Sequence, residues 1–482
     1  MNSGSSLSPA TRTATASLSV LAAALFVYSM LESQLSPALP QIQTAVGAST
    51  TGIAWVFTGL LLSAAVSTPL VGRLADVHDK RSVLLGVLTI VAVGILVSAL
   101  APNVYVLAAG QILQGVGLSL MSLAVGIIRD SLAPGRIASS TGFMVGMASA
   151  GQAVALVLVG PILLVLDYTW LYWIPLVVIG IAIVAAWIFV PSCPPVKQER
   201  VDWPGAALLG TGLALVLLGL SVSPAVGWGS PVVLGLLVVG LLVIAGFTML
   251  ELRRRDPLVD VALLKNRAVL VTSANAFVVG LAAIVMLVLV PIAVQLPAAA
   301  TGYGLGGSVL ESGLFLLPLG LVGAVTAPVA ARVERLLGAR AVLLIGSAAI
   351  AAGSLLLIAA PGRPWIIPVA TGLGGLCFAF GLTQVMNNVV WTVPADRTSS
   401  LSALMLVARS VGGTLGAQLG AVFLALSADP VTQLPTWSGF RNAFLLAGAA
   451  SVAALLITFA LPARLGSPES VRGKEITAPL AE

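Results

Sequence analysis

The chain has 482 residues, of which 59% are apolar and only 8% are charged. An average soluble domain is about 25% charged, so the 17 acidic and 23 basic residues cannot cover the surface of a soluble protein of this length. This composition excludes a soluble enzyme, a disordered chain and a nucleic-acid-binding domain, and the mean hydropathy of +1.09 indicates a polytopic membrane protein. The net charge of +6 comes from bases in short gaps between apolar runs, which is typical of a topology signal.

The predicted elements are membrane-spanning helices, each of which needs about 20 apolar residues to cross the hydrocarbon layer. Fourteen stretches meet this length. In chain order they are residues 15–40, 52–71, 82–101, 104–128, 139–166, 169–191, 203–223, 231–250, 269–296, 310–331, 340–360, 365–392, 400–426 and 441–462.

The basic residues predict the orientation of these spans. Nearly all of the 23 Lys and Arg residues fall in alternate connectors, on the side that holds both chain ends. Cytoplasmic loops carry such an excess of Lys and Arg. Both termini are therefore predicted to be cytoplasmic, with the protein multi-pass in the plasma (inner) membrane.

Two connectors on this side resemble each other. One reads Gly72-Arg-Leu-Ala-Asp76-Val-His-Asp-Lys80-Arg81, and the other runs from Ala330 through Glu334 to Arg340. Each places an acid four residues after a small residue and bases at the start of the next span. A repeat of this size predicts two six-helix halves with a two-helix insert between them.

The first connector resembles the loop signature of the major facilitator superfamily, and fourteen spans resemble its longer drug:proton antiporter branch. Three further motifs support this resemblance, namely Leu31-Glu32-Ser33 in the first span, Gln114-Gly115-Val116-Gly117 in the fourth, and Gly151 with Gly160-Pro161 in the fifth. The resemblance implies an all-α polytopic protein with the major facilitator fold. Its expected parts are an N-terminal tail (1–14), a first half (15–191), an insert (203–250), a cytoplasmic connector (251–268), a second half (269–462) and a disordered tail (463–482).

The sequence departs from the family patterns at several positions. In the loop signature Val77 replaces a base and Asp79 replaces a glycine. In the fourth span Gln111 stands where the family usually has Arg, and the fifth-helix motif has Leu164-Val165 where a glycine pair is expected. These departures bear on coupling more than on the fold.

Glu32 is the candidate proton-coupling residue. It lies in the outer half of an apolar span, where a charge near the bilayer centre costs roughly 2.5–3.5 kcal/mol on insertion scales. We expect it to be the only acid well inside a span. The alternative is that Glu32 lies near the outer interface, where it is paired with another group or exposed to water.

The gate and the antiporter helix are expected from the resemblance. In the family the loop acid pairs with bases, faces a helix N-terminus and locks the inner side. The candidate gate residues are Gly72, Asp76, Lys80, Arg81 and Asp130, and the alternative is that the bases act only as topology signals. The candidate antiporter-helix residues are Gly151, Gly160 and Pro161.

Polar residues inside apolar spans are candidates for lining a cavity, because in lipid they are expected to face the protein interior. Arg409 either lines the cavity or extends to the cytoplasmic interface. For each amide, bridging between helices competes with lining the cavity. Together they predict a polar, nearly uncharged cavity. The candidates are Gln34, Gln111, Gln114, Gln152, Asn275, Gln384, Asn387, Asn388 and Arg409.

The sequence therefore predicts a proton-coupled efflux transporter that exports amphipathic drugs, antibiotics or metabolites by alternating access. No cofactor, metal or nucleic-acid partner is expected, and the chain has no nucleotide-binding loop that would allow direct ATP drive. The protein is expected to be a monomer, and it is not expected to be an enzyme. The alternatives are an importer or facilitator of a small organic solute on the same fold, and a transport-dead sensor.

Overall fold

The computed structural model describes residues 9–48, 50–194, 202–253, 266–359, 361–392, 398–432 and 434–459. The expected tail 463–482 and most of the expected connector 251–268 lie outside these residues. The helices are α1 (Pro9–Ala45), α2 (Thr50–Val77), α3 (Lys80–Ala99), α4 (Val104–Gly115), the 3₁₀ turn η1 (Val116–Ser119), α5 (Leu120–Ser131), α6 (Pro134–Val165), α7 (Trp170–Phe189), α8 (Trp203–Val226), α9 (Pro231–Glu251), α10 (Arg267–Gln295), α11 (Ala298–Thr301), α12 (Val309–Leu337), α13 (Ala339–Ala359), α14 (Ile366–Thr392), α15 (Thr398–Leu426) and α16 (Trp437–Phe459).

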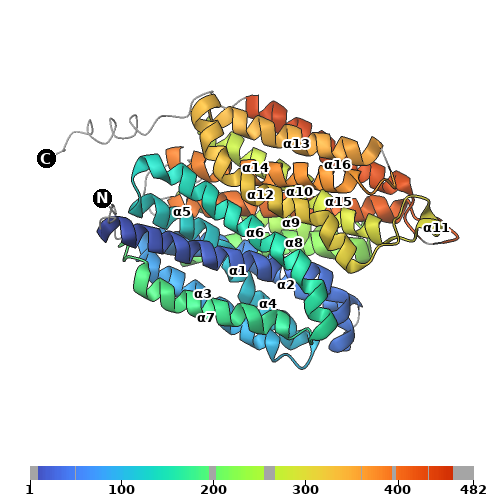
Figure 1. Ribbon diagram of the computed structural model, residues 1–482, viewed down its shortest axis with the longest axis horizontal. Helices are drawn as coiled ribbons and strands as arrows, with labels where there is room; N and C mark the ends of the chain where they lie inside the picture. Colours follow the sequence, from blue (N-terminus) through green and yellow to red (C-terminus); the bar gives the residue numbers. More distant parts are fainter. Residues whose placement is uncertain are drawn as a thin grey trace, which may run out of the picture.

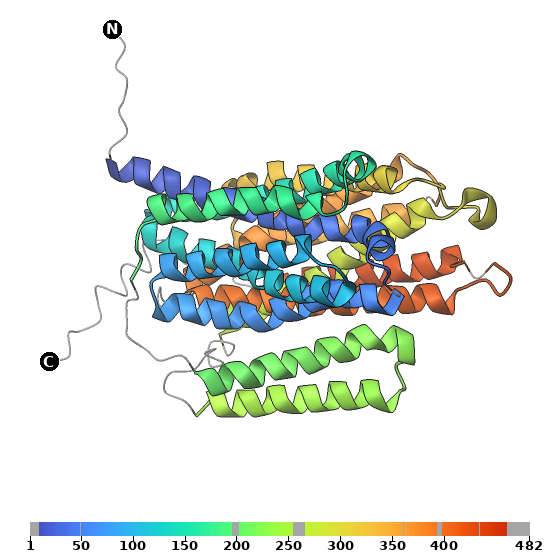
Figure 2. The ribbon, with the colours of Figure 1, turned by 90° about the horizontal axis from the view of Figure 1, so that it is seen from below.

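Long helices account for all fourteen predicted spans. Thirteen segments of the described residues are long and apolar enough to cross a membrane, and α4, η1 and α5 together form one of them. The fourteenth is α2, a 28-residue helix that packs among them. We call the end of the bundle where α1 begins and α16 ends the terminal end, and the opposite end the distal end (Figure 2).

Several helices extend past the spans predicted for them. The helices α2 and α12 continue to Val77 and Leu337, so Asp76 and Glu334 belong to helices rather than to connectors. The expectation that these acids lie in loops is wrong. Hydropathy ends a predicted span at the first charged residues. The helix itself continues with its backbone hydrogen bonds as long as neighbouring helices pack against it.

Polar side chains fix where several helices begin. The side chain of Asn103 accepts from the backbone N–H groups of Tyr105 and Val106 at the start of α4. At the start of α12, Ser308 and Glu311 form a reciprocal capping box. Such caps satisfy N–H groups that have no partner within the helix.

The helices pack as two bundles with matching internal contacts. In the first bundle α1 packs on α6 and α7, α2 on α4, and α3 on α4 and α7. In the second, α10 packs on α15 and α16, α12 on α14, and α13 on α14 and α16. The bundles meet along two seams, α6 with α12 (Figure 1) and α2 with α15. The two sets of contacts correspond element by element, as expected for an internal repeat.

The repeat extends to single glycines. A Cβ atom on Gly151 of α6 would collide with the backbone carbonyl of Phe26 on α1. A Cβ atom on Gly412 of α15 would collide in the same way with the carbonyl of Phe277 on α10. In each half, glycine lets the fifth span (α6 or α15) approach the backbone of the first span (α1 or α10) closely.

The helices α8 and α9 form a separate pair beside the two bundles (Figure 2). The helix α8 packs on both α2 and α15. Its Leu209 and Leu213 cluster with Phe247 of α9 and Val407 of α15. The insert therefore lies over the α2–α15 seam.

Candidate transport cavity

A cavity of about 660 Å³ lies between the two bundles. It is lined by residues of α1, α2, α6, α10, α12, α14 and α15, together with Leu118 of η1. Along α10 the lining runs from Asn275, in the third turn, to Leu296 beyond the last turn. The cavity thus extends along most of α10 to its distal end.

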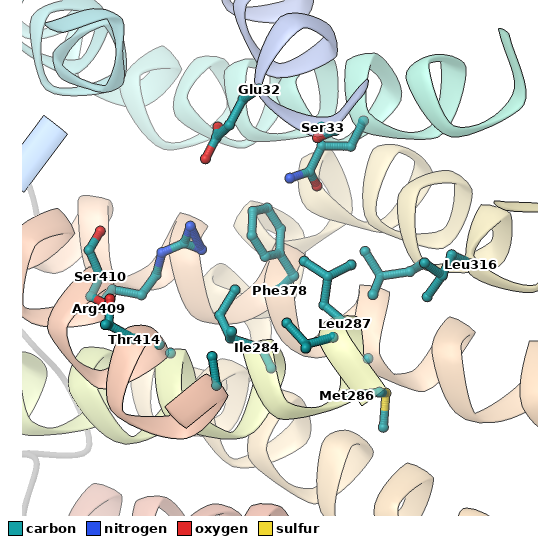
Figure 3. Close-up of a pocket in the computed structure, with 18 of the residues that line it drawn as sticks. Glu32, Ser33, Ile284, Met286, Leu287, Leu316, Phe378, Arg409, Ser410 and Thr414 are labelled. Carbon is teal, nitrogen blue, oxygen red and sulfur yellow. The ribbon is translucent and has the colours of Figure 1, made fainter. Parts of the chain in front are cut away.

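One acid and one base face each other across this cavity. Glu32 comes from α1 and Arg409 from α15, and their side chains point toward each other (Figure 3). The Arg409 guanidinium carbon lies 4.8 Å from the centre of the Phe378 ring, an arrangement typical of a cation–π contact. Of the two alternatives for Arg409, the structure places it in the cavity.

The rest of the cavity wall is amphipathic. Ser410, Thr414 and Gln418 follow at four-residue intervals along α15 and form a polar stripe. The hydroxyls of Ser410 and Thr414 donate to carbonyls of their own helix, so their remaining lone pairs can accept hydrogen bonds. Much of the remaining wall is apolar, with Leu287 and Leu316 in view in Figure 3. The cavity wall is therefore more apolar than expected, and Glu32 and Arg409 are the charged residues among those that line it.

Two of the predicted amides line the cavity. Gln152 comes from α6 and Asn275 from α10. Asn275 also donates to the hydroxyl of Thr458 on α16, over 2.8 Å. Within the described residues, the side-chain oxygens of both amides are buried and have no hydrogen-bond partner. They can accept hydrogen bonds from a ligand or from water.

Three other amides join helices away from the cavity. The Gln34 amide donates to the carbonyl of Leu171 over 2.6 Å, which ties α1 to α7. Gln111 donates to the hydroxyl of Tyr172, and Gln114 donates to the hydroxyl of Ser98 on α3. At the position where the family usually has Arg, Gln111 thus forms a hydrogen bond without charge between α4 and α7. Gln384, Asn387 and Asn388 lie together between α12, α14 and α10.

Tyr28 is a cavity residue that the sequence analysis missed. It lies one helical turn before Glu32 on α1, and its ring occupies the space that a side chain at Gly117 would need. Its hydroxyl is buried. The four-residue spacing to Glu32 was the available signal, because residues four apart share a helix face. The glycines of the fourth-span motif make room for this ring and, at Gly115, for the backbone of α2.

At the terminal end, Asp76 of α2 joins the two bundles. Its carboxylate accepts from the backbone N–H groups of Ser399 (3.1 Å) and Ser400 (2.8 Å) and from the Ser400 hydroxyl (2.6 Å). These donors lie in the first turn of α15, where the helix dipole also favours a negative charge. Asp76 is only 3% exposed. We call this contact the latch.

The other predicted gate residues surround the latch. A Cβ atom on Gly72 would lie 2.7 Å from that of Ala403, so α2 and α15 touch closely here. The Lys80 ammonium pairs with Asp130 at 2.7 Å. Arg81 is not part of the latch, since it donates to the carbonyl of Trp187 on α7. The structure thus brings Gly72 and Asp76 to α15 and sets Lys80 and Asp130 beside them as a second pair.

The predicted antiporter-helix residues lie on two sides of α6. Gly151 faces α1, as described above, whereas a Cβ atom on Gly160 would lie 3.2 Å from the Leu310 side chain of α12. Pro161 lies inside the helix. The α6–α12 seam is close along much of its length, because Gly142 of α6 and Gly313 of α12 each approach a carbonyl of the other helix.

Asp79, which replaces a glycine of the loop signature, has its own role. Its carboxylate accepts from the backbone and hydroxyl of Ser82 and from Ser192 and Cys193. Partial burial acts to raise the pKa of Asp79, but these hydrogen bonds outweigh it and hold the pKa below its ordinary value. The residue caps α3 and anchors the segment that follows α7.

A buried latch at one end, an amphipathic cavity open toward the other and a repeated helical architecture define a multi-pass membrane transporter. The chain belongs to the Major Facilitator Superfamily, whose profile matches residues 21–417.

Curated relatives are named for drug resistance. The multidrug resistance protein B homolog of Mycobacterium tuberculosis is 29% identical, over 78% of this chain and 70% of its own length. The tetracenomycin C resistance and export protein of Streptomyces glaucescens is 28% identical, over 88% and 80%. The puromycin resistance protein pur8 of Streptomyces alboniger is also 28% identical, over 88% and 86%.

Solved structures share the fold. The human organic anion transporter MFSD10 aligns with a TM-score of 0.64 and 16% identity, covering 95% of this chain and all (100%) of that one. The nucleoside transporter NupG aligns with a TM-score of 0.57 and 14% identity, covering 92% of this chain and 99% of that one.

Proposed function

We propose that this protein exports amphipathic drugs, antibiotics or metabolites across the plasma membrane in exchange for protons. The two bundles alternate between a state open at the distal end and a state open at the terminal end. Glu32 is the group that binds and releases the proton, and Asp76 holds the terminal end closed in the distal-open state.

The observation that carries this proposal is the Glu32–Arg409 pair in the cavity. Without its proton, Glu32 offsets the charge of the guanidinium across the cavity. With its proton, it leaves the cavity with a net positive charge. Binding of a proton from the distal side therefore changes what the cavity attracts, which is the competition that an exchanger needs.

The substrate class follows from the cavity wall and is supported by the relatives. A polar stripe on α15 beside apolar side chains suits a molecule with one polar edge and one apolar face. Relatives named for resistance to puromycin and tetracenomycin C support the same class.

The orientation rests on the distribution of Lys and Arg. The terminal end would face the cytoplasm, and the distal end with its cavity would face outside. The protein acts as a monomer in this proposal, because each chain contains a complete cavity between its own two halves.

The proposal is tested first in cells. A strain without its own pumps, expressing the protein, is grown with puromycin and with ethidium, and the intracellular amount of each compound is measured. An exporter lowers accumulation and raises resistance. Increased accumulation would instead establish an importer, and unchanged accumulation of the whole panel would contradict export.

The second test concerns Glu32 and uses purified protein in liposomes. We expect Glu32→Gln to lose efflux driven by a proton gradient while it still exchanges puromycin down its own gradient, because the amide keeps the shape but binds no proton. Glu32→Asp retains a carboxyl group and should keep part of the coupled transport. Full gradient-driven efflux by Glu32→Gln would contradict the role of Glu32.

A further inference from the structure

A second acid, Glu334, lies on the terminal side of the cavity and is not used by the mechanism above. It is the acid that the repeat matches to Asp76, yet the two carboxylates make different contacts. Asp76 reaches across the seam to α15, whereas Glu334 stays within its own half and contacts α14. Glu334 lies in the last turn of α12, beyond the span predicted for this helix, so the expectation that Glu32 is the only acid well inside a span stays a prediction.

The partners of Glu334 are neutral amides. The amide nitrogens of Gln384 and Asn387 donate to its two oxygens over 3.0 and 2.7 Å. The Trp391 side chain also forms a hydrogen bond with it. Gln384 and Asn387 are 0% and 1% exposed, so this carboxylate is held by buried groups that carry no charge.

Charged groups from the surrounding helices lie elsewhere. On α12 itself, Arg332 and Arg335 are exposed, and so are Arg136 of α6 and Arg267 of α10. The guanidinium of Arg340, on α13, lies over the ring of Phe459. The contacts described for Glu334 therefore include no cation, so this carboxyl group can gain or lose a proton without breaking an ion pair.

Hydrogen bonds run from this acid to Thr272 of α10, close to the cavity. Gln384 also donates to Asn388 over 2.8 Å, and Asn388 donates to Thr272 of α10 over 3.1 Å. Thr272 lies one helical turn from Asn275, which lines the cavity. Within the described chain, the side-chain oxygens of Gln384 and Asn387 are buried acceptors with no partner. Buried acceptors of this kind are normally satisfied by a donor such as water.

The helices that carry this cluster also line the cavity. The α10 residues from Asn275 to the distal end of that helix, and the α14 residues from Gly374 to Val385, contribute to the cavity wall. The cluster continues along the same two helices toward the terminal end. When the terminal end opens, these parts of α10 and α14 become the wall of the opposite cavity. Glu334 and its amides would then meet water from the cytoplasmic side.

We propose that Glu334 is a second proton-binding carboxyl of the transport cycle, reached from the terminal end when that end opens. This inference rests on the proposed function, because it adds a proton to the exchange assigned to Glu32. Glu32 takes up its proton from the distal cavity, and Glu334 exchanges its proton on the other side.

The test counts protons in liposomes, with puromycin as the transported probe and entrapped pyranine as the pH indicator. We expect Glu334→Gln to move fewer protons per puromycin than the wild type. At a gradient of one pH unit, each coupled proton is worth about tenfold in the concentration ratio, so the steady-state ratio should fall by up to about tenfold. Glu334→Asp should keep the wild-type proton count. The control Glu311→Gln, which can preserve the capping box at the distal start of α12, should match the wild type.

A second variant tests the inference independently if Glu334→Gln does not fold. Asn387→Asp places another carboxyl against Glu334, and two acids in contact favour a shared proton. Its efflux should therefore depend on pH in a range shifted upward from that of the wild type.

Two results would overturn the inference. One is a Glu334→Gln protein that binds puromycin and moves as many protons per puromycin as the wild type. The other is an unshifted pH dependence in Asn387→Asp. If efflux by the wild type did not depend on the proton gradient at all, the proposed function itself would be contradicted. Failure of the proposed function can therefore be told apart from failure of the inference about Glu334.

Discussion

Two acids three residues apart, Asp76 and Asp79, show how position decides what a carboxylate does. Asp76 lies inside α2 and holds the first turn of a helix from the other half. Asp79 lies just outside and holds the start of α3 and the backbone of Cys193 within its own half. In the proposed cycle the first contact breaks when the terminal end opens, whereas the second persists throughout.

At the scale of the residue, the lowered pKa of Asp79 predicts a pH-dependent stability. Because the folded value lies below the unfolded one, the carboxylate stabilises the fold above the unfolded pKa of about 3.9. That contribution is lost as the pH falls through the folded pKa. Asp79→Ala should therefore lower the free energy of unfolding by about 1 kcal/mol at neutral pH, the usual cost of a lost helix cap.

This prediction is checked by thermal unfolding in detergent at several pH values. The difference between wild type and Asp79→Ala should shrink in acid. The control Asp167→Ala removes an exposed carboxylate from the connector between α6 and α7 and should change little. A difference that is constant with pH would mean that the charge of Asp79 contributes nothing.

Some residues of the candidate site could be predicted from the sequence, and others could not. A charge in an apolar span is costly wherever it lies, so Glu32 could be singled out from its position alone. For Arg409 two positions were open, and only the packing of α15 against α10 and α14 places it in the cavity. Glu334 was identified only as the repeat partner of Asp76, because the predicted span ended before it. Whether an amide bridges helices or lines a cavity depends on its facing partner, which hydropathy does not encode.

At the scale of the element, the latch joins α2 to α15. We expect Asp76→Asn to insert normally but to export at least roughly tenfold more slowly. A hydrogen bond to a charged group contributes about 1.5–3 kcal/mol, and 1.4 kcal/mol changes a conformational ratio tenfold. Ser400→Ala removes one of the three hydrogen bonds and should have a smaller effect in the same direction. Normal export by Asp76→Asn would reduce this region to a topology signal.

The matched glycines of the fifth helices give another prediction at this scale. Gly151→Val should push α6 away from α1, and Gly412→Val should push α15 away from α10. Each substitution should strongly reduce the yield of folded protein. Gly86→Val is the control, because a Cβ atom at Gly86 on α3 meets nothing within 4 Å. Size-exclusion chromatography of the detergent-solubilised variants measures the result. Normal folding of either variant would contradict the close contact with Phe26 or Phe277.

At the scale of the whole molecule, the fold was largely predictable and its boundaries were not. The number of spans follows from hydropathy, because lipid imposes a minimum apolar length on every helix. The extended ends of α2 and α12 depend on contacts with the other helices. The cavity depends on how the two bundles meet, which only the assembled structure reveals.

The orientation of the molecule can be tested with two matched cysteines. Gly135 lies in the first turn of α6 at the terminal end, and Gly229 lies in the connector between α8 and α9 at the distal end. A Cβ atom at either site meets nothing within 4 Å, and the native Cys193 and Cys377 are buried. In intact cells an impermeant thiol reagent should label Gly229→Cys and spare Gly135→Cys. The reverse pattern would overturn the predicted topology.

The insert formed by α8 and α9 bears on where an exported compound goes. It covers the α2–α15 seam, and on the other side α6 and α12 pack closely, so neither flank offers a ready passage between the cavity and the acyl chains. In the proposed orientation, a molecule that leaves at the distal end would enter water rather than the outer leaflet. Protection of the cell would then depend on a race between the turnover of the carrier and the passive permeability of the compound, and slowly permeating compounds would be cleared most completely.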